Sequence, residues 1–322
     1  MTRRFACAYF ALLLVWPVVV QGCARGKEAE GGGPVKSHFG RETEQPNCAS
    51  PQLTLTEQQA FRLPDGNWSP NSIAFDGRSL AVGDRANPVV WVHRPAAQPR
   101  RIDLPGADVV AVGFSGSGVL EVVDRTSRQV LTISDSGKLL SSRALYGVEG
   151  DIEEAQLDDG KWYIGARSGS DYQVYALEQS SITLVGRIKG TIGEVSSPMW
   201  ARLSVFADTV TITRRAWPFS VSRFHKGHQS GVFSLTTRDS AGLSDWVALP
   251  ALRLSCAFLI TLSHLRSPSR RLLLLRDDGS LIREARLEAP IGFVASEMDS
   301  VVIAVRKVAD WEVVVYNWTL EQ

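Results

Sequence analysis

The sequence predicts an all-β protein in which a four-stranded unit is repeated six times. From residue 53 onward, short runs rich in Val, Ile, Leu, Trp and Tyr alternate with turns of Gly, Asp, Ser and Pro. Helical periodicity is nearly absent there, and short apolar runs bounded by turn residues are typical of strands. The same succession of strands and turns also recurs about every 40 residues, as it does in repeat architectures.

Each copy opens with an apolar strand, turns at a pair similar to Asp-Gly, and continues through three more strands, the last of them more polar. The copies cover residues 72–105, 109–145, 152–188, 195–250, 252–287 and a last one that begins at 291. Repeats of this length with four strands each predict a six-bladed β-propeller. Two packed sheets are the alternative, but a sandwich does not explain the repeat.

The two ends of the repeat region predict how the ring of blades closes. The last copy reaches only its third strand, "EVVVYNWTL", whereas an additional strand, "QLTLTEQQAFRLP", precedes the first copy. The ending "FRLP" resembles "IDLP" before Gly106 and "VALP" before Ala251, where outer strands are expected to end. We therefore expect the N-terminal strand to supply the outer strand of the last blade.

Composition and charge exclude several classes of protein. The 322 residues carry 35 Lys and Arg against 34 Asp and Glu, so the formal charge is only +1. This balance argues against a nucleic acid as partner, since such binders are usually strongly basic. After residue 20 there is no apolar run of the roughly 18 residues that a membrane-spanning helix needs.

The first 23 residues have the features of an export signal. Arg3 and Arg4 precede the apolar run 5–20, and the sequence Val20-Gln21-Gly22-Cys23 follows. This sequence resembles a bacterial lipobox, which implies cleavage before Cys23 and lipidation of its sulfur. An ordinary secretory signal with an incidental cysteine is the alternative.

The lipobox resemblance divides the chain into a signal peptide (1–22), a lipidated cysteine with a flexible tether (23–50) and a propeller domain (51–322). Residues 24–47 are rich in Gly, Glu and Lys and have few aliphatic side chains, as is typical of a tether. The expected location is the cell envelope, with the lipid anchor in the membrane. In a Gram-negative host this implies the outer membrane, and in a Gram-positive host the outer face of the plasma membrane.

Two further cysteines, Cys48 and Cys256, lie in or beside the expected propeller domain. An exported domain experiences an oxidising compartment, so these two residues could form a disulfide. Nothing in the local sequence brings them together, and the pairing stays open.

One segment of the first copy resembles a known propeller family. Residues 69–92, "SPNSIAFDGRSLAVGDRANPVVWV", are similar to the NHL and SMP-30/gluconolactonase-like repeat. In SMP-30-like lactonases the resemblance implies a divalent metal in the central channel, held by a Glu, two Asn and an Asp from different blades. Asn71 matches one such position, but no second opening of this kind recurs, so a turn-forming role for Asn71 is the competing interpretation. Ca²⁺ is the cofactor only if this lactonase alternative holds; otherwise no cofactor is expected.

The aligned copies share an arginine at the end of their second strand. The residues are Arg85, Arg125, Arg167, Arg214, Arg266 and Arg306. Because these strands end on one face of a propeller, the arginines are expected to gather there and to offer bidentate donors to carboxylate, sulfate or phosphate groups. The alternative is that they form ion pairs with acidic residues of the same or a neighbouring blade.

Two other segments are expected to contribute to the same face. Residues 214–231 are interpreted as a long loop in which Trp217 and Phe219 stand among basic residues, a composition found at recognition sites. His225 and His228 lie in the same segment, without a carboxylate or cysteine nearby in the sequence that would indicate a metal site. The acidic segment 147–154 is expected opposite this loop and would give the face two poles of charge.

These observations favour a membrane-anchored module outside the cytoplasm that binds an anionic glycan or an envelope protein at the arginine-bearing face. No GxSxG or HExxH motif points to a hydrolase. A Ca²⁺-dependent lactonase or hydrolase of SMP-30-like type is the alternative, and a purely structural surface protein with paired arginines is a third.

Overall fold

The computed structural model describes residues 52–63, 70–84, 86–94, 97–115, 118–134, 136–179, 181–191, 200–216, 219–234, 245–249, 251–254, 257–267, 270–276, 278–287, 291–294, 301–307 and 311–321. Contacts divide the chain into two units, Met1–Thr43 and Glu44–Gln322, and all described residues belong to the second. Cys23, Cys48 and Cys256 therefore lie outside the described residues, as do the predicted signal peptide and tether. No helix in the described ranges is long and apolar enough to cross a membrane.

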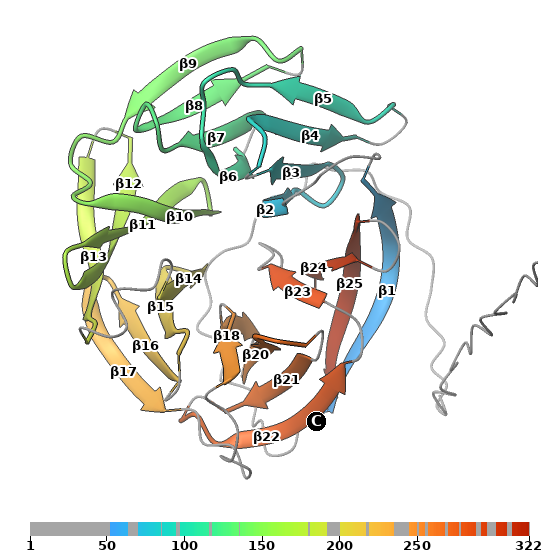
Figure 1. Ribbon diagram of the computed structural model, residues 1–322, viewed down its shortest axis with the longest axis vertical. Coiled ribbons are helices and arrows are strands. Elements are labelled where there is room, and N and C mark those ends of the chain that lie inside the picture. Colours follow the sequence, from blue (N-terminus) through green and yellow to red (C-terminus); the bar gives the residue numbers. More distant parts are fainter. Residues whose placement is uncertain are drawn as a thin grey trace, which may run out of the picture. The chain divides into compact units, whose positions relative to one another are not determined.

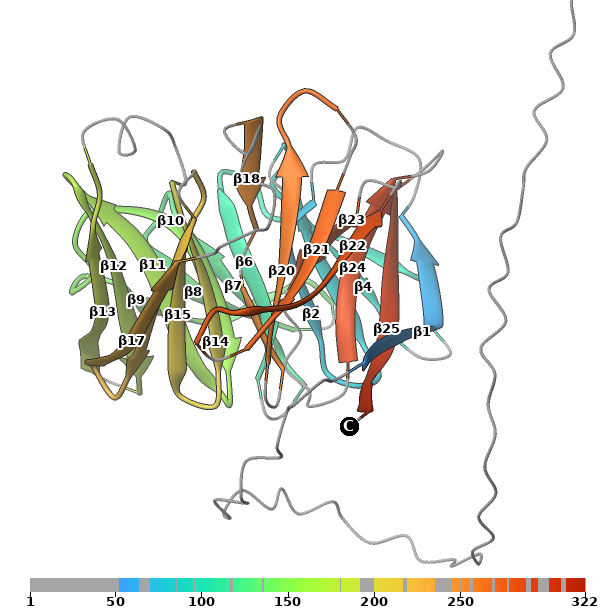
Figure 2. The same ribbon diagram turned by 90° about the horizontal axis from the view of Figure 1, so that it is seen from below.

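The second unit consists of antiparallel sheets placed around a common centre (Figure 1). Viewed from the side, their strands run between the two faces of this arrangement (Figure 2). The first sheet contains β2 (Pro70–Phe75), β3 (Leu80–Asp84), β4 (Val89–His93) and β5 (Arg100–Asp103). The second contains β6 (Val109–Phe114), β7 (Leu120–Asp124), β8 (Gln129–Ile133) and β9 (Leu139–Ala144), and the third contains β10 (Asp151–Asp158), β11 (Lys161–Ser168), β12 (Asp171–Glu178) and β13 (Ser181–Lys189).

The remaining sheets continue around the centre. The fourth contains β14 (Ala201–Phe206), β15 (Thr209–Arg214), β16 (Ser220–His225) and β17 (His228–Ser234). The fifth contains β18 (Trp246–Ala248), β19 (Leu252–Leu254), β20 (Ala257–His264), β21 (Arg270–Leu275) and β22 (Leu281–Leu287). The last consists of β23 (Ile291–Val294), β24 (Val301–Lys307), β25 (Trp311–Glu321) and, at its outer edge, β1 (Gln52–Arg62).

The predicted all-β propeller of four-stranded blades is confirmed, but the blades are not all alike. Five sheets have four strands, whereas the fifth along the chain has five. Two short strands share its innermost position, since β18 pairs with one half of β20 at Trp246↔His264 and β19 pairs with the other half at Leu252↔Leu259. Pro250 stands between them in the sequence, and proline cannot donate a ladder hydrogen bond.

The expected division between the fourth and fifth copies was wrong. Residues 247–249 were expected to end an outer strand, but β18 is an inner strand of the fifth sheet. The outer strand of the fourth sheet is β17, which follows β16 through a tight turn at Lys226 and Gly227. Both turn residues have positive φ angles, 49° and 80°, and such a turn matches the twist of a hairpin. Most of the expected loop 214–231 is therefore a hairpin.

The apolar core lies between neighbouring sheets. Val90, Ile102 and Leu120 belong to a cluster that joins the first and second sheets, while Leu145, Trp162 and other side chains join the second and third. Further clusters join the third to the fourth sheet, the fourth to the fifth, and β1 and β25 to the first sheet. A single sheet cannot bury its apolar faces alone, so each blade depends on its neighbours for stability.

Side chains of the innermost strands also bond to the backbone of the next blade. Asn71 Nδ2 donates to the Val109 carbonyl at 2.7 Å, and Ser72 Oγ accepts from the Val112 amide at 3.0 Å. Gln156 contacts both backbone groups of Val205, donating to its carbonyl at 3.0 Å and accepting from its amide at 2.9 Å. These contacts fix the position of β2 beside β6 and of β10 beside β14.

Candidate functional site on the strand-start face

We use the term strand-start face for the face at which the innermost strands β6, β10, β14 and β18 begin. A repeated backbone bond defines equivalent positions on it. The amide of Arg125, just after β7, donates to the Asp108 carbonyl just before β6 at 3.0 Å. The amide of Arg215 donates in the same way to Trp200 at 3.0 Å, and that of Leu265 to Asp245 at 2.8 Å. In the third sheet Arg167 pairs with Asp151, at the start of β10.

Arg125, Arg167 and Arg215 therefore occupy the same position on three successive blades. The predicted residue Arg214 lies one place earlier, as the last residue of β15, and Arg266 lies one place after the equivalent Leu265. The sequence alone does not show this offset. Structurally equivalent residues can be identified only from the residues to which their backbone amides bond.

Three of the predicted arginines lie within ion-pair distance of acidic side chains. Arg125 Nε donates to Asp108 Oδ2 at 2.9 Å, and Arg167 Nε donates to Glu153 Oε1 at 2.8 Å. Arg167 also lies 3.5 Å from Asp151, and Arg266 lies 3.8 Å from Asp245. These are the pairs that the alternative interpretation of the arginines expected.

Arg214 has a different environment. Its guanidinium carbon lies 5.5 Å from the centre of the Trp200 ring, and its Nη2 donates to the Lys189 carbonyl. Trp200 in turn meets the edge of Tyr172, with ring centres 6.1 Å apart. The cation–π contact with Trp200 limits the orientations of the Arg214 guanidinium.

The other predicted site residues do not add to this face in the described part of the chain. Arg85 and Trp217 lie outside the described residues. Arg306 lies in β24, where its backbone pairs with Ile291 of β23 and Glu312 of β25, and its side chain is not described. Phe219 is fully buried in the core between the fourth and fifth sheets, so the expectation that it contacts a ligand was wrong. Its apolar ring is used for packing.

Glu154 is a carboxylate near the strand-start face that bonds to groups of two blades. A β-bulge in β10 between Ile152 and Glu154 inserts Glu153 as an additional residue. Glu154 Oε1 accepts from the Tyr172 hydroxyl at 2.6 Å and from the Leu203 amide, while Oε2 accepts from Arg202 Nε at 2.9 Å. Glu154 therefore joins the third sheet to β14 of the fourth.

The close approach of Tyr172 to Glu154 requires a glycine in the neighbouring strand. A Cβ atom at Gly165 would lie 2.1 Å from the Tyr172 hydroxyl oxygen and 3.3 Å from Glu154 Cγ. Burial, and then the nearby Glu154 carboxylate, hold the pKa of Tyr172 well above its usual range. The hydroxyl thus stays protonated and remains a donor to Glu154.

Arg215 lies near the charges of Glu153, Glu154 and Arg202. Burial lowers its pKa, as does the Arg202 guanidinium, while Glu154 and Glu153 partly offset these effects. Within the acidic segment 147–154, which was expected opposite the loop 214–231, Glu153 contacts Arg167 and Glu154 contacts Arg202. Trp200, Arg202 and Tyr172 were not predicted, because their role depends on contacts between blades.

The described residues do not fit the Ca²⁺ site that the SMP-30 resemblance implied. Asn71 Nδ2 donates to the carbonyls of Val109 and Val110, while its buried Oδ1 has no hydrogen-bond partner among the described residues and is the atom that could face a cation. One such oxygen does not supply the several convergent ligands that Ca²⁺ needs. The buried carboxylates Glu153 and Glu154 are bonded to guanidinium groups, which a cation would have to displace. Within the described ranges, no three His, Cys, Asp or Glu side chains are grouped to hold a metal ion.

Comparison with solved structures supports the propeller fold. A gluconolactonase from Xanthomonas campestris matches with a TM-score of 0.54 and 12% identity, over 85% of this chain and 96% of that one. A virginiamycin B lyase from Staphylococcus aureus, crystallised with quinupristin, matches with a TM-score of 0.51 and 11% identity, over 83% and 89%. A member of the DUF4221 family from Bacteroides vulgatus matches with a TM-score of 0.53 and 8% identity, over 84% and 99%. At these identities the likeness concerns the fold alone.

No protein-family model matches the chain, and no curated protein matches it in sequence.

We predict that Glu154→Gln lowers the free energy of unfolding by about 3 kcal/mol, because it leaves Arg202 without a buried charge partner and places an NH₂ group among three donors. The Glu154 and Arg202 side chains are only 13% and 20% exposed. Asp103→Asn is the matched control: its pair with Arg101 has side chains 63% and 54% exposed, so a change within about 0.5 kcal/mol is expected. Urea denaturation measures both, and equal losses would contradict the assigned role of Glu154.

Proposed function

We propose that this protein is a lipid-anchored propeller of the cell envelope that binds an anionic glycan or an envelope protein at the strand-start face. The observation that carries the proposal is the common position of Arg125, Arg167 and Arg215 on three successive blades. Guanidinium groups at equivalent positions of successive blades suit a ligand with several anionic groups, since an accessible guanidinium can form a bidentate bond to each of them.

The ion pairs of Arg125 with Asp108 and of Arg266 with Asp245 are compatible with binding. The Arg125 and Asp108 side chains are 37% and 32% exposed, and Arg266 is 81% exposed. Pairs this accessible contribute little net stability, about 0–1 kcal/mol each, so an incoming anion can replace the internal partner at low cost. Arg214, supported on Trp200, extends the same surface.

The alternative is a Ca²⁺-dependent lactonase or hydrolase of SMP-30-like type. The gluconolactonase among the similar structures favours this alternative at the level of the fold. Against it stands the bonding of Glu153 and Glu154 to arginines. A gain in thermal stability with Ca²⁺ alone would favour the lactonase over the binding module.

We predict that oligogalacturonate, as an acidic glycan probe, raises the melting temperature more at low salt than at high salt, whereas a neutral oligosaccharide of equal length does not. Saturation at about 100 times Kd should add roughly 2.7 kcal/mol to the free energy of unfolding. The double variant Arg125→Gln/Arg214→Gln should bind at least about tenfold more weakly, as expected for the loss of two charge-assisted bonds.

The matched control for this titration is Arg143→Gln, which removes an arginine from the outermost strand β9. It should bind as the unaltered protein does. Equal weakening by Arg143→Gln, or no weakening by the double variant, would reject the strand-start face as the anion site. If the acidic glycan has no effect, the glycan form of the proposal is rejected and envelope proteins remain to be captured on the same variants.

The proposed anchor is a lipid on Cys23, with the propeller domain held outside the cytoplasm. The support is the order of charged residues, apolar run and Gly22-Cys23 at the start of the chain. Two or more acyl chains give stable membrane attachment, which a single chain does not.

We predict that cells expressing the chain incorporate labelled palmitate into it and retain it in the membrane fraction. Cys23→Ser should abolish the labelling and release the protein, because no thiol remains to be acylated. Cys48→Ser is the control and should change neither result. Unaltered membrane retention of Cys23→Ser would contradict the anchor.

We also propose that the propeller has six blades and that β1 closes its ring. Support comes from the pairing of β1 with β25 at ten positions, from Gln52↔Glu321 to Arg62↔Glu312, and from Phe61, which packs with Ile73 and Leu80 of the first sheet. A strand from one end of the chain then holds the other end in place and covers an exposed sheet edge.

We predict that removal of residues 52–63 abolishes cooperative thermal unfolding, since the last and first sheets lose their shared strand and core. Circular dichroism during heating measures this, and removal of residues 24–43 is the control that should leave the transition unchanged. An unaltered transition without β1 would contradict the closure.

A further inference from the structure

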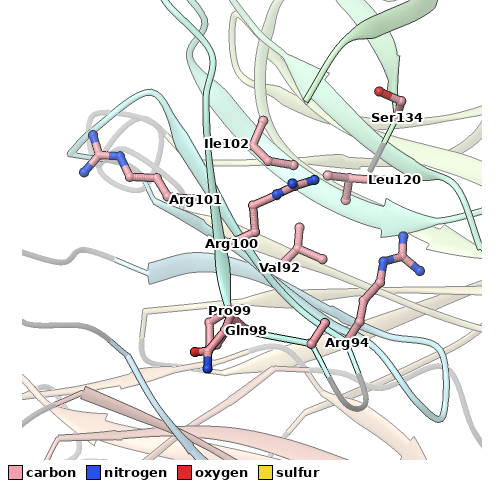
Figure 3. Close-up of a pocket in the computed structure, with 10 residues that line it drawn as sticks. Val92, Arg94, Gln98, Pro99, Arg100, Arg101, Ile102, Leu120 and Ser134 are labelled. Atoms are coloured by element: carbon pink, nitrogen blue, oxygen red, sulfur yellow. The ribbon is translucent and has the colours of Figure 1, made fainter. Parts of the chain in front are cut away.

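A cavity of about 600 Å³ lies between the outer parts of the first and second sheets (Figure 3). Its walls come from β4, β5 and the residues between them, and from Leu120 of β7 and Ser134 after β8. This place is separate from the innermost strands and from the arginines of the strand-start face. A volume of this size is within the range of small-molecule sites.

The floor of the cavity is apolar and firmly held. Val92, Ile102 and Leu120 line it, and all three belong to the core cluster that joins the first and second sheets. They are 8%, 4% and 1% exposed, so their positions are fixed by packing on strands. Ala97 and Pro99 add further apolar surface at the edge.

The polar part of the lining is one-sided in charge. The ten lining residues that the structure describes include Arg94, Arg100 and Arg101 but no Asp or Glu. Figure 3 shows Arg100 directed across the cavity toward Leu120, whereas Arg101 is directed away from it. Arg101 pairs with Asp103 outside, with Nε and Oδ1 2.8 Å apart.

Arg94 is oriented by the neighbouring blade. Its Nη2 donates to the Gly118 carbonyl at 3.1 Å, and its guanidinium carbon lies 5.7 Å from the centre of the Phe114 ring. Phe114 is the last residue of β6 and Gly118 precedes β7, so both partners belong to the second blade. Arg94 follows β4 of the first blade. The guanidinium is thus held beside the cavity.

We propose that this cavity binds an amphipathic anion, with an apolar body on Val92, Ile102 and Leu120 and its carboxylate at Arg100 and Arg94. A desolvated floor favours the apolar body, at about 25 cal/mol for each Å² that it covers. The guanidinium groups add a charge-assisted bond that fixes the orientation. This inference is independent of the proposed function, because none of its residues lies on the strand-start face.

The test is a calorimetric titration of the purified protein with decanoate, and with decanol and acetate as probes that each lack one of the two required features. Decanoate should bind at least tenfold more tightly than either. Arg100→Gln should weaken decanoate binding at least tenfold, whereas Arg101→Gln, which removes the adjacent guanidinium that is directed away, should leave it unchanged. Both residues are exposed, so both variants should keep the melting temperature of the unaltered protein.

Three results would overturn the proposal. These are no binding of decanoate, equal binding of decanol, and equal loss in the two arginine variants. The double variant Arg125→Gln/Arg214→Gln should bind decanoate normally, which separates this site from the strand-start face.

Discussion

The structure depends on the contact between neighbouring innermost strands. No sheet of the propeller can bury both its faces alone, and the apolar clusters between sheets supply most of the stability without fixing how one blade is placed on the next. Polar side chains fix that placement. Ser72 Oγ accepts from the Val112 amide, and Glu154 accepts from the Leu203 amide, and both acceptors follow the bulge of their strand. The same bond therefore joins the first blade to the second and the third to the fourth.

The candidate site is built on this contact. The bulge that places Glu154 against β14 also inserts Glu153, which reaches Arg167 on its own blade. The corresponding bulge residue is Asn71 in the first blade and Val110 in the second, so the position carries an amide, an apolar group or a carboxylate while the backbone stays the same. Of these three described bulges, the one in the third blade carries a charged residue. The charges of Arg167, Arg202 and Arg215 are consequently coupled to contacts that also hold two blades together, so changes there affect stability as well as any binding proposed for this face.

Local sequence patterns predicted the strands, the repeat and the extra strand before the first copy, because each depends on residues close together in the chain.

The same patterns did not predict contacts between residues that are distant in the chain. Glu154 bonds to Leu203, 49 residues away, and Trp162 Nε1 bonds to Glu121, 41 residues away. The aromatic and basic composition of 214–231 suggested an exposed loop, but the two-residue turn at Lys226 and Gly227 makes a hairpin, and Phe219 is needed in the core. The cavity beside Arg100 had no sequence signal, since adjacent arginines at a strand start are ordinary surface residues until the next blade is placed beside them.

The two arginine-bearing regions differ in how they would meet an anion. On the strand-start face Arg125, Arg167 and Arg266 already have acidic partners, so a ligand gains only the difference between its own bonds and those that it replaces. A ligand with one anionic group gains little from such an exchange, whereas one that spans several blades adds small gains at each. In the outer cavity the apolar floor of Val92, Ile102 and Leu120 contributes binding energy that does not depend on charge. The first arrangement therefore favours extended polyanions and the second a small amphipathic one, and salt should weaken the first much more than the second.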